Sequence, residues 1–215
     1  MRVSRATVKA TRRYDSSTRR RAAEERRRAV LNVAGRRFLK NGYAATTVAS
    51  IASEAGTSVE MLYKAFGGKP GLVRALWDTG LAGEGPVHAE VRSDEVSGVE
   101  SDPLVIIASW ARLSMEVAPR AAPILLLVRE AAASDPDMAS VMQELEDQRL
   151  ARMTHNADAL ARGGNLREGM TRDQARDVLF TYSSPEIYEL LVIRQGWTLD
   201  DFAQFLRQGI AATLL

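Results

Sequence analysis

The sequence predicts an all-α fold, and three observations support this prediction. Apolar residues recur at helical spacing along most of the chain, and typical helix start and stop residues bracket each periodic stretch. No segment shows the alternating pattern of a half-buried strand. With 215 residues, 46% hydrophobic and 26% charged, the chain has the composition of a globular protein that buries its own core.

Charge is distributed unevenly along the chain. Residues 1–72 carry 16 basic and 5 acidic side chains, a net charge of +11, whereas residues 73–215 carry 13 and 22, a net charge of −9. A basic front on an acidic body is typical of a protein that presents one end to a polyanion. The alternative is a charge run that only faces solvent.

Composition also excludes several classes of site and location. The chain has no cysteine, which rules out disulfides, cysteine-based zinc sites and a thiol nucleophile. The longest apolar run, Pro123–Val128, is far shorter than a membrane span. The basic N-terminus lacks the apolar core of a secretory signal, so we expect a cytoplasmic protein.

The first helix is predicted from about Thr18 to Asn41. Residues 1–17 have no helical period and are interpreted as a flexible basic arm. Gly42 follows as a left-handed stop. The inward-facing residues of this helix are Val30, Val33, Ala34 and Phe38.

Two short helices and a fourth, longer one are expected next. Thr47 caps a helix that ends before Gly56, and either Thr57 or Ser58 caps the following helix, which runs to about Phe66. Glu60 stands three residues after Thr57, so a capping box is possible there. After Gly67 and Gly68, Pro70 suits the first turn of the fourth helix, which runs through Leu72, Leu76 and Leu81.

The rest of the chain is predicted to form a helical body. Gly83–Ser101 is rich in glycine, serine and acidic residues and is interpreted as a long, loose connection. Capping residues and apolar periodicity predict helices over Leu104–Val117, Pro123–Ala133, Met138–Ala161, Arg172–Tyr182, Pro185–Arg194 and Leu199–Leu214.

The most informative segment is Thr47–Phe66, which has the pattern of a helix-turn-helix. Ala52 is small enough for the close crossing of two helices, and Gly56 allows the positive φ that the turn requires. The small core beneath is supplied by Ile51, Leu62 and Phe66. The N-terminal end of the second helix then points into a DNA major groove, where its dipole also favours phosphate.

The wider context resembles the TetR family of transcriptional regulators. Val30–Gly56 is similar to the first two helices of that family, and Leu62–Leu72 resembles its "LY–x–x–F–x–x–K–x–x–L" stretch. The resemblance is close over residues 28–77. Ser184–Thr198 is similar to the C-terminal domain of one TetR subgroup.

The resemblance implies a three-helix DNA-binding head at residues 18–68 and a ligand-binding and dimerisation domain at residues 69–215. It also implies a homodimer on palindromic operator DNA, repression released by a small apolar ligand, and no cofactor or metal. Arg172–Tyr182 and Leu199–Leu214 are the expected dimer interface. Two other functions stay open, a sequence-independent DNA-binding protein and a small-molecule binder with a weakened head.

The DNA-contacting residues expected from the resemblance lie on and beside the second helix of the motif. Tyr63 and Lys69 match phosphate-gripping positions of the family, and the others cap or line the helices. Glu60 either accepts a hydrogen bond from cytosine N4 or only caps its helix. The full set is Thr47, Thr57, Ser58, Val59, Glu60, Met61, Tyr63, Lys64 and Lys69.

The head departs from the family pattern at two positions. Val59 and Ala49 stand where lysine and arginine are frequent, and we expect the basic arm at residues 1–17 to compensate. Such an arm acts through phosphate contacts or by entering the minor groove.

Methionine and aromatic residues of the body are candidates for an adaptable apolar pocket, although any single one of them is more often ordinary core material. They are Trp110, Met115, Met138, Met142, Met153, Phe180 and Tyr182. An enzyme is not expected, because His88 and His155 have no partner at metal or triad spacing.

Overall fold

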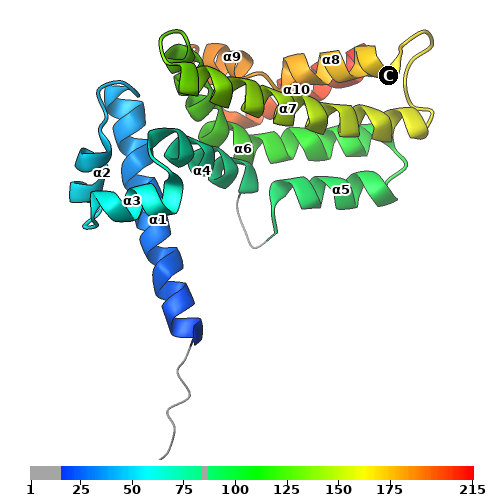
Figure 1. The fold of residues 1–215 in the computed structure, drawn as a ribbon. Coiled ribbons are helices and arrows are strands. Elements are labelled where there is room, and N and C mark those ends of the chain that lie inside the picture. The colour runs from blue at the N-terminus through cyan, green and yellow to red at the C-terminus, as the bar shows by residue number, and fades with distance from the viewer. Residues whose placement is uncertain (1–15, 84–86) are drawn as a thin grey trace, which may run out of the picture.

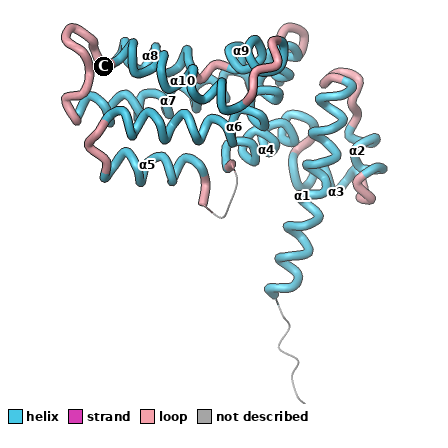
Figure 2. Tube along the Cα trace, turned by 180° about the vertical axis from the view of Figure 1, so that it is seen from behind, coloured by secondary structure: helices cyan, strands magenta, loops and turns pink. Residues whose placement is uncertain are grey.

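A computed structural model describes residues 16–83 and 87–215, and all of its regular elements within these ranges are helical (Figures 1 and 2). The head consists of α1 (Ser16–Asn41), α2 (Val48–Glu54) and α3 (Val59–Phe66), and α4 (Lys69–Ala82) connects it to the body. The body consists of α5 (Ala89–Val99), α6 (Pro103–Ala132), α7 (Pro136–Arg162), α8 (Arg172–Tyr182), α9 (Pro185–Tyr188), the π-helical η1 (Glu189–Arg194) and α10 (Leu199–Leu214).

Helix α1 begins at Ser16, two residues before the expected start, and ends before Gly42 as predicted. Its burial in the core starts at Val30, which is the first buried residue along the helix. The half before Val30 projects from the head, away from the body (Figure 1). Most of the predicted basic arm, residues 1–15, lies outside the described residues.

Side-chain caps set the ends of α2 and α3. The Thr47 hydroxyl accepts a hydrogen bond from the backbone N–H of Ser50 at 3.1 Å, which confirms the predicted cap. Ser58, not Thr57, caps α3, because its hydroxyl accepts from the N–H of Met61 at 3.1 Å. The possible capping box of Thr57 with Glu60 is therefore wrong, since Glu60 lies one position too early in the helix.

The predicted loose connection at Gly83–Ser101 is wrong, because most of it forms α5. This helix buries little apolar surface and is held by polar side chains instead. Arg92 forms two hydrogen bonds with Glu116 of α6, at 2.6 and 3.0 Å, and Arg152 of α7 contacts Asp94 at 2.5 Å. The apolar periodicity of the sequence therefore does not predict this helix.

The predicted break between Val117 and Pro123 is also wrong, because one helix, α6, runs through it with Pro119 and Pro123 in its interior. An interior proline costs roughly 3 kcal/mol through a lost hydrogen bond and a steric clash. Burial offsets this cost, since α6 packs against α4, α7 and α10. Tertiary packing thus overrides the local signal.

The hydrophobic core falls into two clusters. The first joins the head to the near ends of α6 and α7, and the second fills the far end of the body. At the junction, Trp77 of α4 is buried and donates to the side-chain oxygen of Gln148 at 3.0 Å. Arg74 pairs with Glu144 at 2.7 Å nearby. Helix α4 therefore belongs to both parts and fixes the head against the body.

Candidate nucleic-acid interface

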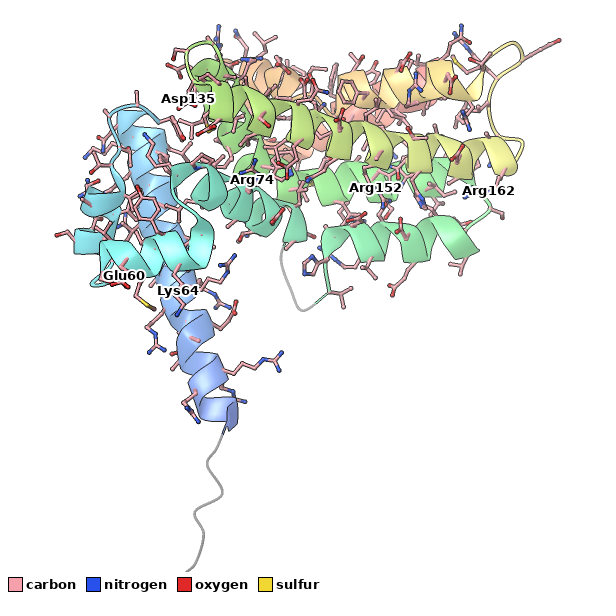
Figure 3. All side chains as sticks on the ribbon, in the orientation of Figure 1. Glu60, Lys64, Arg74, Asp135, Arg152 and Arg162 are labelled. Carbon is pink, nitrogen blue, oxygen red and sulfur yellow. The ribbon has the colours of Figure 1, made fainter. Side chains whose placement is uncertain are left out.

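Helix α3 buries Leu62, half-buries Phe66 and presents its other residues to solvent. Leu62 is 1% exposed, whereas Met61 and Tyr63 on either side of it are each 54% exposed. Figure 3 places Glu60 and Lys64 on the side of α3 toward which α1 projects. The exposed face of α3, defined by Ser58, Val59, Glu60, Met61, Tyr63 and Lys64, is free to enter a groove.

The start of α3 also offers backbone donors. Ser58 satisfies the N–H of Met61, but the first N–H groups of any helix have no partner within the helix. The positive end of the helix dipole lies at the same place and favours an anion. Thr57 is half-buried in the preceding turn, next to Gly56, whose φ of +65° meets the predicted requirement.

Ion pairs hold α2 against α1. Glu54, at the end of α2, accepts hydrogen bonds from Arg36 at 2.6 Å and from Arg37 at 2.5 Å. These bonds hold the pKa of the Glu54 carboxyl below its usual value. The buried Thr46 hydroxyl donates to the carbonyl of Gly42 at 2.8 Å, which fixes the loop before α2. Helix α2 therefore supports α3 on a rigid base.

Lys69, which is predicted to contact phosphate, makes contacts inside the head. Its ammonium donates to the carbonyl oxygen of Tyr43 at 2.7 Å and lies 4.0 Å from the centre of the Tyr43 ring. Burial lowers the pKa of Lys69. An ammonium has three donors, so a phosphate contact is compatible with this bond. Tyr63 is exposed, and its ring packs beside Gly68, where an added Cβ would lie 3.2 Å from Tyr63 Cε1.

Tyr43 gives the head a measurable pH dependence. Burial, with Asp135 and Asp137 of the body nearby, raises the pKa of Tyr43 to about 12 from 10.0. The folded protein then keeps this proton where the unfolded chain loses it, so stability is intact below pH 10 and falls as pH rises toward 12. Denaturation of the wild type should show a loss of stability between pH 9 and pH 11.5 of which roughly 2 kcal/mol is absent in Tyr43→Phe. Equal losses in both proteins would contradict this assignment.

The exposed arginines of α1 were not predicted from the sequence as part of the interface. Arg20, Arg21, Arg26 and Arg28 are all exposed, and none has a hydrogen-bond or ion-pair partner within the described ranges. Alanine is the sole apolar residue type between Thr18 and Val30. A helix polar on every side does not pack against its own core, and this signal was available in the sequence.

The structure does not bring the expected pocket residues together. Met138 and Met142 lie in the core cluster at the head–body junction, and Trp110, Met153 and Tyr182 lie in the far cluster. Phe180 lies under the guanidinium of Arg149, 4.2 Å from its ring centre. Met115 lines a surface cavity of about 360 Å³ between α6 and α10. Helical spacing predicts which residues face inward, but it does not predict where two helices separate and leave a cavity.

Comparison with known proteins agrees with the geometry of the head. Residues 30–76 match the family described as bacterial regulatory proteins, tetR family. No curated protein matches the sequence. Within the described ranges, no helix is long and apolar enough to cross a membrane.

Solved structures share the fold of the whole chain. A TetR-family regulator from Syntrophomonas wolfei has a TM-score of 0.70 and 19% identity, covering 90% of this chain and 98% of its own. NalD, the secondary repressor of a multidrug efflux pump in Pseudomonas aeruginosa, has a TM-score of 0.69 and 22% identity, and also covers 90% of this chain and 98% of its own. A regulator from Saccharomonospora viridis, solved with choline, has a TM-score of 0.65 and 19% identity, covering 89% of this chain and 98% of its own.

Proposed function

Because residues 30–76 place this chain in the TetR family of bacterial regulatory proteins, we propose that it represses transcription by binding a palindromic operator as a homodimer. The observation that carries the proposal is the exposed face of α3, which leaves Glu60, Met61 and Lys64 unburied at the end of a rigid head. A helix presented in this way fits the major groove, about 12 Å wide.

The predicted DNA-contacting residues divide into two proposed roles. Tyr63, Lys64 and Lys69 contact phosphates, with Thr47 and Thr57 beside the backbone, and these contacts set the register. Ser58, Val59, Glu60 and Met61 face the base edges. Since Ser58 supplies the cap of α3, we favour base contact over capping for Glu60, whose carboxylate accepts a hydrogen bond from cytosine N4.

We place the dimer interface on α8 and α10, with η1 between them in the sequence. The supporting observation is that Leu190, Ile193 and Trp197, in η1 and just after it, are exposed at 50%, 54% and 38%. Three large, exposed apolar side chains within eight residues of the sequence suit a surface that a partner covers. A two-fold dimer then sets two α3 helices on two half-sites of opposite orientation.

Release by a small apolar ligand is proposed to act through α4. This helix shares one core with α6 and α7 and carries the Arg74–Glu144 and Trp77–Gln148 contacts. A ligand that binds the body better in one orientation of α4 shifts the head accordingly. The related regulator solved with choline supports a body that accepts small molecules.

Selection of random duplex DNA by the purified full chain at about physiological salt tests the proposal. We expect a two-fold palindrome with half-sites about 10 base pairs apart, bound at least about 1000-fold more tightly than unrelated DNA. Retained DNA without a shared sequence would replace the proposal by a sequence-independent binder. No retained DNA, also after screening for a releasing ligand, would indicate a small-molecule binder with a weakened head.

A further inference from the structure

The first half of α1 is an exposed helix that contributes no buried residue to the core of the described chain. Residues 19–29 are exposed apart from the half-buried Ala22, and burial begins at Val30. At 1.5 Å per residue this segment is about 16 Å long. Arg20 and Glu24, Arg21 and Glu25, and Glu24 and Arg28 stand four residues apart, a spacing that supports a solvent-exposed helix.

Arginines occupy several sides of this segment. It contains six arginines and two glutamates, and residues seven apart lie nearly on one line along a helix. The guanidinium of Arg27 lies 4.6 Å from the centre of the Phe66 ring, so its line faces α3. Arg20 continues that line about 10 Å farther out. Arg19 and Arg26, and Arg21 and Arg28, form two further lines around the helix.

The segment projects on the side of α3 that carries Glu60 and Lys64 (Figure 3). Its length of about 16 Å exceeds the major-groove depth of about 8.5 Å. If α3 enters a groove, a segment of this length beside it is long enough to reach the sugar–phosphate backbone that borders the groove. The contact of Arg27 with Phe66, at the end of α3, fixes its direction relative to α3.

We propose that residues 19–28 form a second DNA-binding element, which binds phosphates flanking the bases that α3 faces. The inference rests on the proposed function and deepens it. Because arginines lie on several sides of the helix, they suit a groove that has a phosphate backbone on each side. A flat acidic protein surface would contact only one line of arginines. Backbone contacts carry no sequence information, so this element contributes affinity and salt dependence and leaves sequence preference unchanged.

The test uses the full chain with Arg20, Arg21, Arg26 and Arg28 changed to glutamine. Glutamine has nearly the helix propensity of arginine, and Arg27 stays because it contacts Phe66. The control carries the same change at four exposed arginines of the body that lie outside the proposed dimer helices, Arg112, Arg120, Arg162 and Arg167. Affinity for the selected DNA is measured from 0.05 to about 0.3 M salt, with circular dichroism to compare helix content.

We expect the α1 variant to bind at least about 100-fold more weakly at 0.15 M salt, with the slope of log K against log salt reduced by about 0.9 per lost phosphate contact. The control should keep the wild-type affinity and slope. The inference is overturned if the α1 variant binds like the wild type, or if the control loses as much. In a further outcome, the wild type selects no DNA sequence, while the salt dependence of its DNA binding is still reduced by the α1 substitutions and not by the control. In that case the regulator proposal fails and this inference stands. An acidic protein partner would leave DNA binding unchanged in the variant.

Discussion

Replacing Gly71 with alanine is expected to destabilise the head by at least about 3 kcal/mol, the upper end of what overpacking costs. Gly71 is the third residue of α4, directly after the turn from α3. A Cβ at this position would overlap the carbonyl oxygen of Phe66 and lie 2.7 Å from its carbonyl carbon. Both are backbone atoms, so relief requires α3 and α4 to separate, which also displaces the exposed face of α3. Urea denaturation followed by circular dichroism measures the loss.

Gly98 provides the matched control. It also lies inside a helix, α5, but a Cβ there meets no atom within 4 Å. Gly98→Ala should therefore stabilise the protein slightly, by roughly 0.5 kcal/mol, because alanine loses less backbone freedom on folding. If Gly71→Ala also leaves the unfolding free energy within about 0.5 kcal/mol of wild type, then α3 and α4 do not pack as closely as the contact between Gly71 and Phe66 requires.

Reversing the charge of Lys64 is expected to lower operator affinity about 100-fold, since a loss of about 1.4 kcal/mol in each protomer is doubled in the dimer. Lys64 is exposed on the α3 face (Figure 3) and is proposed to contact phosphate. Lys64→Glu removes that contact and adds repulsion from the DNA backbone. Because the side chain is exposed, stability should change little. A titration of fluorescent operator DNA at fixed salt measures the effect.

Lys40→Glu makes the same charge change elsewhere on the head. Lys40 is exposed in the last turn of α1, at the end of the helix far from its projecting half (Figure 1). We expect less than about a tenfold loss of affinity for this variant, from long-range charge alone, and a small loss of helix stability. Equal losses in the two variants would mean that total charge, rather than the α3 face, determines binding.

Local signals in the sequence were sufficient to predict most helix ends. Thr47, Thr171 and Thr198 each cap a helix with the side-chain oxygen, and Gly42 and Gly56 adopt the positive φ that the turns require. These residues act within one turn of the chain, so their effect does not depend on distant contacts. The exposure of the α3 face likewise agrees with the motif from which it was predicted.

Features that depend on distant contacts were not predictable in the same way. Helix α5 is held by Arg92–Glu116 and Arg152–Asp94 pairs that join separate helices. Two prolines remain inside α6 because the surrounding helices bury it. The expected pocket residues are dispersed, because the direction of a side chain within a helix does not tell which helices separate. The arginines of α1 were visible in the sequence, but their projection depends on where the head packs.

The central claim, that α3 lies in the major groove of both half-sites, has a direct test because the chain contains no cysteine. A cysteine placed at Met61, which is 54% exposed on α3, can carry a DNA-cleaving iron chelate, with Val99 on α5, 88% exposed, as the control position. Operator DNA should be cut in two groups about 10 base pairs apart by the chelate at position 61, and uncut by the chelate at position 99. Cleavage spread evenly along the DNA, or equal from both positions, would contradict the account.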